Sequence, residues 1–130
     1  MKLEILNTPK ELLSQKTLSK SITKIFNGYN ISTVNVIFVK NDEIKELNKQ
    51  YRKKDYVTDV LSFNIDSEDL LGELYIASDY VIETIGIEKY TEEIVRLIIH
   101  GTLHLLGYEH TDEMFNIQEE MVQHVLRDIK

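Results

Sequence analysis

The stretch Thr91–His110, TEEIVRLIIHGTLHLLGYEH, determines both the centre of this fold and its chemistry. It begins with two glutamates, which suit the first turn of a helix, and it is strongly apolar from Ile94 to Leu105. Gly107 follows, and a glycine at this place can adopt the left-handed conformation that ends a helix. We therefore predict an apolar helix that begins at Thr91 and stops before Gly107.

Three of the four histidines of the chain lie in this stretch, at His100, His104 and His110. The first two are four residues apart, so a helix places them on one face with their side chains about 5–6 Å apart. A turn at Gly107 can bring His110 back over that face as a third ligand. Three neutral imidazoles with one open position describe a catalytic zinc site, and water bound there has a pKa near 7.

An isolated histidine pair at this spacing is more often a pair of exposed surface residues, or a partly buried pair whose hydrogen bonds are made within the protein. The third histidine and the aliphatic residues around it favour a metal, because burying three imidazoles without partners is unfavourable. The chain has no cysteine, so a metal site must use His, Asp or Glu. We therefore predict that one Zn²⁺ ion binds to His100, His104 and His110.

The spacing of the histidines equals that of the zinc-protease pattern H-E-x-x-H-x-x-G-x-x-H, with one change. Gly101 stands where such a protease carries its general-base glutamate. Glu109 is the nearby carboxylate, and it lies in the expected turn rather than on the helix. The metal geometry thus resembles that of a peptidase, whereas the chemistry is expected to differ.

Outward from this stretch, strand-like and helix-like patterns alternate. Strand patterns occupy residues 3–7, 33–38, 60–63 and 73–77, and helix patterns occupy 8–28, 78–86 and the segments after 41, 91 and 111. The expected helix caps are Thr8 (with Glu11 as its capping-box partner), Asn41 and Ser78, and the last helix is expected to begin at Thr111 and Asp112. This order predicts an α/β fold (an α+β sandwich) with a mixed, mainly parallel four-stranded sheet packed with about five helices.

The length and the net charge of the chain indicate its number of domains and limit how it can bind nucleic acid. The chain has 130 residues, which suits a single domain spanning 1–130, and its net charge is −7. This charge argues against binding nucleic acid by bulk positive charge, and we expect no DNA partner. No aliphatic run is long enough for a membrane span and the first residues lack the apolar core of a signal peptide, so we expect a cytoplasmic protein.

The densest basic cluster of this acidic chain consists of Lys49, Arg52, Lys53 and Lys54. One interpretation is a solvated helix end, where cations also suit the helix dipole. The other is a substrate-binding patch for a polyanion. A guanidinium at Arg52 can hold a phosphate through two parallel hydrogen bonds and stays charged at any working pH.

Two long motifs resemble the YbeY family of bacterial zinc-dependent endoribonucleases. The first is the histidine motif 100–110, in which the family usually has Asp where this chain has Glu109, and the second spans residues 48–63. A shorter match begins at Leu71. The resemblance implies an α/β sandwich, a zinc cofactor, a functional arginine at Arg52, and cleavage of single-stranded RNA. It also implies maturation of ribosomal RNA at the 3′ end of the small-subunit RNA, ribosome quality control, and ribosomal partners.

Three functions remain open at this point. The first is a metal-dependent endoribonuclease whose catalytic residues are Arg52, His100, His104 and His110. The second is a metallopeptidase or another zinc hydrolase that uses the same histidines. The third is a ribosome-associated factor with a structural metal. The glycine at position 101 and the presence of Arg52 favour the first over the second.

Overall fold

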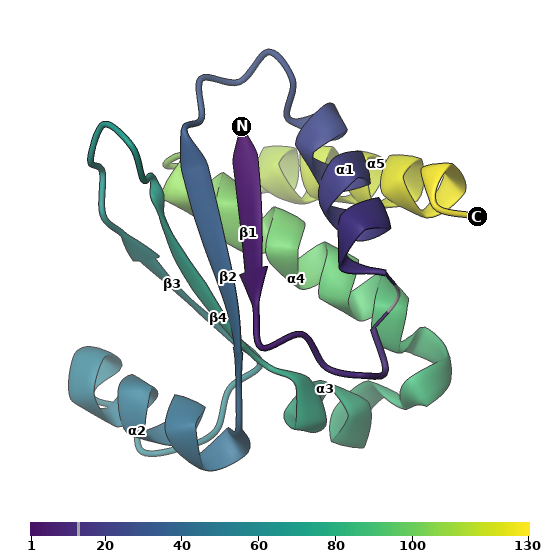
Figure 1. The fold of residues 1–130 in the computed structure, drawn as a ribbon. Coiled ribbons are helices and arrows are strands. Elements are labelled where there is room, and N and C mark those ends of the chain that lie inside the picture. Colours follow the sequence, from purple (N-terminus) through teal and green to yellow (C-terminus); the bar gives the residue numbers. More distant parts are fainter. Residues whose placement is uncertain (13) are drawn as a thin grey trace.

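The computed structural model describes residues 1–12 and 14–130, and its elements follow the predicted order (Figure 1). The strands are β1 (Lys2–Leu6), β2 (Thr33–Val39), β3 (Val60–Asn64) and β4 (Gly72–Ala77). The helices are α1 (Gln15–Ile25), α2 (Asn41–Arg52), α3 (Ser78–Ile85), α4 (Tyr90–Leu105) and α5 (Asp112–Asp128), with a 3₁₀ turn at Ile87–Lys89. None of the helices in the described residues is long and apolar enough to cross a membrane.

The four strands form one sheet in the order β1-β2-β4-β3. β1, β2 and β4 run parallel, and β3 pairs with β4 in the antiparallel sense, as expected for a hairpin at the sheet edge. The predicted mixed, mainly parallel four-stranded sheet with five helices is therefore confirmed.

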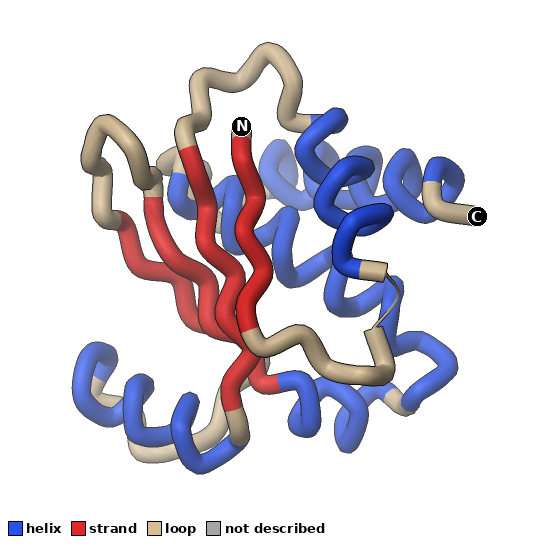
Figure 2. Tube along the Cα trace, in the orientation of Figure 1, coloured by secondary structure: helices blue, strands red, loops and turns tan. Residues whose placement is uncertain are grey.

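Helices cover both faces of this sheet (Figure 2). On one face, side chains such as Val34, Val36 and Leu74 are fully buried in the main core, over which α1, α4 and α5 pack (Figure 1). On the other face, α2 buries Ile44 in a second, smaller core that includes Leu61. Because β3 and β4 take part in both layers, this end of the sheet holds α2 and α4 on opposite sides.

α4 is the central helix, as the apolar stretch predicts. Ten of its 16 residues are buried, and Ile94 and Ile98 have no exposed surface. The helix ends at Leu105, and Gly107 follows with a φ of 100°. The predicted stop at this glycine is thus confirmed, because few other residues adopt that conformation without strain.

The predicted start of the first helix at Thr8 is wrong. α1 begins at Gln15, and the backbone N–H of Leu12 donates to the carbonyl of Pro9 in a turn. The Thr8 hydroxyl donates to the side chain of Gln15 over 2.9 Å, and Leu12 is buried in the main core. Burial of Leu12 therefore favours a turn here, although the local capping pattern favours a helix.

Two other predicted caps shift by one position. Asn41 and Ser78 are the first residues of α2 and α3, and neither stands before its helix. The Ser78 hydroxyl is instead 2.6 Å from the hydroxyl of Tyr90, which joins the start of α3 to the start of α4. Thr111 does cap α5, because its hydroxyl accepts from the backbone N–H of Met114.

Gly72 lets the β3–β4 hairpin approach the end of α4. A Cβ atom at this position would lie 2.5 Å from the backbone carbonyl oxygen of Phe63 and 2.7 Å from a methyl carbon of Leu105. The side chain of Asn64 donates to the Leu105 carbonyl over 2.8 Å, so the hairpin is also hydrogen-bonded to the end of α4. A larger residue at position 72 would push these elements apart.

We therefore expect Gly72→Ala to lower the free energy of unfolding by about 1–3 kcal/mol, because overpacking a rigid backbone contact is destabilising by this amount. Urea denaturation followed by circular dichroism measures the change. Glu68→Ala, an exposed change in the same hairpin, is the control and should stay within about 0.5 kcal/mol of the parent chain. Equal stabilities of Gly72→Ala and Glu68→Ala would contradict this account of the hairpin.

Candidate metal centre

Three imidazoles converge at the C-terminal end of α4. The Nε2 atom of His104 lies 3.1 Å from Nε2 of His100 and 2.6 Å from Nε2 of His110. The ligand atoms of these residues all lie within 4.8 Å of one another, as one metal ion requires. The structure therefore brings together the three histidines that the sequence predicts as ligands.

The turn after α4 brings His110 to the other two histidines. Its backbone bonds form a Schellman motif, in which Gly107 N–H donates to the His104 carbonyl and Tyr108 N–H donates to the Leu103 carbonyl. The cap of α5 at Thr111 follows directly. His110 thus stands between two fixed backbone features, although its side chain is exposed.

The other ring nitrogens of two histidines face carbonyl oxygens. Nδ1 of His104 lies 3.0 Å from the backbone carbonyl of Tyr108, and Nδ1 of His100 lies 2.7 Å from Oε1 of Gln118. Since a carbonyl oxygen only accepts hydrogen bonds, each Nδ1 must carry the hydrogen. In the neutral form of each ring, the Nε2 lone pair is therefore directed toward the common point.

This donor set fits a divalent metal ion. Lone pairs that face one another at these distances repel, and a cation between them would turn this repulsion into binding. In a tetrahedral zinc site with Zn–N bonds of about 2.0–2.1 Å, the ligand nitrogens are about 3.3 Å apart. The 3.1 Å between Nε2 of His104 and Nε2 of His100 is close to this value, and Nε2 of His110 lies nearer to His104, at 2.6 Å. Imidazole ligands whose second nitrogen donates to a carbonyl are typical of such sites.

The environment also disfavours the protonated form of His104. Burial lowers the pKa of His104 below its usual value, and the neighbouring His100 and His110 lower it further. A neutral imidazole is the form that binds a metal, so the same crowding that disfavours a proton leaves the ligand atom available.

The histidines line a cleft of about 310 Å³ between α4, the end of α2 and β3. Arg52 and Lys54 line the same cleft, although they lie about fifty residues away in the sequence. Among the described residues around this cleft, none is acidic. The remaining lining residues are Asn48, Tyr56, Thr58, Val60, Leu61, Ser62 and Gly101.

Arg52, the last residue of α2, is exposed and held against β3. Its Nη2 donates to the backbone carbonyl of Ser62 over 2.7 Å, and its guanidinium lies 4.8 Å from the ring centre of Phe63. The loop after α2 is fixed by Asn48, a buried residue whose side-chain amide donates to the Tyr56 carbonyl over 2.9 Å. A guanidinium has five N–H donors, and the bond to Ser62 uses one of them.

The three lysines of the basic cluster differ in position. Lys54 lines the cleft, whereas Lys49 and Lys53 do not border it and are exposed at the end of α2. For these two, the placement agrees with the interpretation of a solvated helix end. Glu109 is exposed and is not among the residues that line the cleft.

Gly101 has a structural reason to be a glycine. A Cβ atom there would lie 2.6 Å from a methyl carbon of Leu74, a fully buried residue of β4. This position therefore faces the sheet, where a glutamate side chain has no room. The general base of a zinc protease cannot stand at this place in this fold.

Sequence reasoning missed two side chains beside the histidines. Gln118 is only 4% exposed, and the ring of Phe115 is 5.6 Å from the His110 ring and 6.2 Å from the His100 ring. Gln118 could have been found, because it interrupts the buried stripe that Met114 and Val122 form on α5. A polar residue in such a stripe needs a hydrogen-bond partner. For Phe115, no sequence signal indicates its place.

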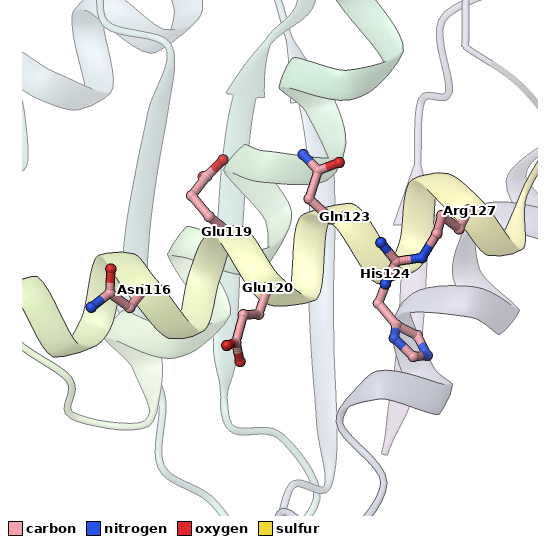
Figure 3. Close-up of a pocket in the computed structure, with 6 residues that line it drawn as sticks. All are labelled: Asn116, Glu119, Glu120, Gln123, His124 and Arg127. Atoms are coloured by element: carbon pink, nitrogen blue, oxygen red, sulfur yellow. The ribbon is translucent and has the colours of Figure 1, made fainter.

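A larger hollow lies on the outer side of α5 (Figure 3). It measures about 740 Å³, and all the residues that border it come from this helix, including Glu119, Gln123 and His124. His124 is exposed there. Among residues 1–12 and 14–130, the three-histidine cluster is the group found with metal-binding geometry, so the smaller cleft is the candidate site.

Comparison with known proteins shows which family this chain resembles. The family model described as endoribonuclease YbeY matches residues 4–128. An endoribonuclease YbeY from Persephonella marina is 38% identical over 87% of this chain and 84% of its own length. One from Thermotoga maritima is 43% identical over 71% of this chain and 67% of its own.

The fold comparison gives the same result. A solution structure of a Thermotoga maritima protein superimposes with a TM-score of 0.69 at 36% identity, over 96% of this chain and 89% of the other. The resemblance seen in the histidine motif is therefore confirmed, and the chain belongs to the endoribonuclease YbeY family.

Proposed function

We propose that this endoribonuclease is zinc-dependent, cleaves single-stranded RNA and acts in the maturation of ribosomal RNA. Residues 1–130 are then one metal-dependent endoribonuclease domain. The observation that carries the proposal is the meeting of three imidazoles and the Arg52 guanidinium in one cleft of about 310 Å³. Zinc held by His100, His104 and His110 would supply Lewis acidity toward a phosphoryl oxygen and lower the pKa of water.

The catalytic task of Arg52 follows from charge. Cleavage of a phosphodiester develops negative charge on the phosphoryl oxygens, and a guanidinium stabilises that charge through two parallel hydrogen bonds. Its bond to Ser62 and its contact with the Phe63 ring position the group before substrate arrives. Such preorganisation reduces the reorganisation needed in the transition state.

The lysines of the basic cluster are proposed to bind the RNA backbone. Lys54 lines the cleft and is the strongest candidate, whereas Lys49 and Lys53 would contact phosphates farther along the strand. The absence of acidic residues from the described cleft lining supports this role, because the −7 charge of the whole chain repels RNA.

The structure weakens the peptidase alternative. Position 101 faces β4 and has no room for a general-base glutamate, and the described lining of the cleft offers no other carboxylate. The opening of the ligand cluster onto a cleft also favours a catalytic over a purely structural metal, since structural zinc sites are closed.

The finer parts of the proposal rest on the family resemblance. They are the 3′ end of the small-subunit ribosomal RNA as the place of cleavage, a role in ribosome quality control, and ribosomal proteins as partners. A cytoplasmic location belongs to the same proposal. The experiment that tests the central statement is cleavage of a single-stranded RNA by the zinc-loaded protein, compared with His104→Ala.

The first expected result concerns the metal. We expect one zinc ion per chain in protein purified without added metal, bound by Nε2 atoms at about 2.0–2.1 Å. His100→Ala/His104→Ala should lose the metal because two of its three ligands are gone, whereas His124→Ala on the outer side of α5 should keep it. Elemental analysis measures both, and full occupancy in the double variant would contradict the ligand assignment.

The second expected result concerns stability. The metal would join the turn that carries His110 to α4, and a ligand that binds only the folded state raises its stability by linkage. Chelation should therefore lower the Tm of the parent chain, as measured by calorimetry. The Tm of His110→Ala should respond much less to the chelator. An unchanged Tm in parent protein with confirmed metal loss would refute this coupling.

The third expected result concerns Arg52. Arg52→Ala should reduce RNA cleavage by about 10²–10³-fold, because a preorganised donor to the transition state is lost, while zinc content and the circular dichroism spectrum stay unchanged. Arg52→Lys should recover only part of the rate, since an ammonium lacks the planar fork of the guanidinium. Initial cleavage rates on a single-stranded RNA measure both variants.

Lys54→Ala serves as the comparison for Arg52→Ala. It should weaken RNA binding modestly and make the dependence of binding on salt less steep, because one phosphate contact is lost, with little change in the cleavage rate at saturating RNA. If Arg52→Ala cleaves at the parent rate, Arg52 has no catalytic role and the basic cluster is a solvated helix end.

A further inference from the structure

A chain of hydrogen bonds runs from α4 to α5 and back to the metal centre. Nε and Nη2 of Arg96 donate to the two carboxylate oxygens of Glu119 over 2.9 and 2.8 Å. Nε2 of Gln118 donates to Oε2 of the same carboxylate over 3.0 Å. Oε1 of Gln118 then lies 2.7 Å from Nδ1 of His100. This series of hydrogen bonds therefore ends at His100, a residue of the three-histidine cluster.

In this series of hydrogen bonds, each group can donate or accept in only one way. A guanidinium only donates and an ionised carboxylate only accepts, so Glu119 must receive a hydrogen bond from the NH₂ end of Gln118. The oxygen end of that amide is then turned toward His100. Because this oxygen only accepts, the hydrogen of the neutral imidazole must be on Nδ1.

The carboxylate at the middle of the chain is kept ionised. The hydrogen bonds from Arg96 lower the pKa of Glu119 below its usual value, and the bond from Gln118 lowers it further. Arg96 also lies 3.5 Å from Glu92 and 3.7 Å from Glu93, so it is held on its own helix as well. The charged pair of Arg96 and Glu119 thus determines which way the Gln118 amide is oriented.

None of the three residues borders the cleft. Gln118, Glu119 and Arg96 are absent from the cleft lining, and Gln118 is almost wholly buried between α4 and α5. A buried amide whose hydrogen-bond partners in the described part of the chain are an imidazole and a carboxylate has no access to substrate. Its influence on the centre passes through His100.

We propose that Gln118, oriented by Glu119 and Arg96, is a positioning residue that holds His100 with its hydrogen on Nδ1 and its Nε2 lone pair toward the metal. This inference rests on the proposed metal centre and adds to it a determinant of metal affinity outside the ligands. A free neutral imidazole exchanges its hydrogen between both nitrogens, and only one of the two forms can bind through Nε2. Outer partners of this kind change metal affinity by about 10–100-fold.

Two measurements on Gln118→Leu test the inference. Long-range ¹H–¹⁵N NMR of metal-free protein at about pH 8, where histidine is neutral, shows which ring nitrogen carries the hydrogen. Competition with a chromophoric chelator gives the zinc affinity. We expect His100 to lose its uniform Nδ1–H form and the zinc affinity to fall about 10–100-fold, with an unchanged circular dichroism spectrum.

Gln123→Leu is the matched control. It makes the same change on the same helix, at a side chain that faces the outer hollow (Figure 3), and it should leave both measurements unchanged.

The NMR result is independent of catalysis and of bound metal. If the parent protein binds no zinc, the proposed function fails, and the tautomer comparison still decides the role of Gln118. If Gln118→Leu keeps both the Nδ1–H form and the parent zinc affinity, the positioning role is overturned.

Discussion

The burial of α4 on almost every side is the constraint on which the rest of the structure depends. The helix contacts the sheet so closely at Gly101 that a single added carbon would collide with Leu74. With this face held against β4, His100 and His104 lie at the border of the cleft. The site therefore gains its rigidity from the core.

Which ring nitrogen of His100 and His104 carries the hydrogen depends on residues outside the proposed ligand set. One acceptor, the Tyr108 carbonyl, comes from the turn that ends α4, and the other, Gln118, comes from the next helix. Both leave Nε2 as the free nitrogen. The turn and the α4–α5 interface thus act on the chemistry as well as on the packing, because they determine which ring atoms can bind an ion.

Local patterns made the histidine triad predictable, whereas its surroundings depend on distant contacts. The spacing of His100 and His104 and the turn at Gly107 follow from helix geometry alone, and the strand and helix order follows from periodicity. The start of α1 could not be found in this way, since burial of Leu12 overrides a good cap at Thr8. Nor could local patterns place Arg52 beside the histidines, because that requires α2 and β3 to meet.

The distribution of charge explains how an acidic chain can act on a polyanion. At a net charge of −7, the long-range electrostatic interaction between the protein and a polyanion is repulsive. The affinity for RNA must therefore come from contacts within a few ångströms. The described cleft lining carries Arg52 and Lys54 and no carboxylate, which reverses the sign of the charge locally. Under the proposed function, a strand that enters the cleft would bring a phosphate to the guanidinium. The geometry of the cleft, rather than the total charge, would then decide which RNA segments bind.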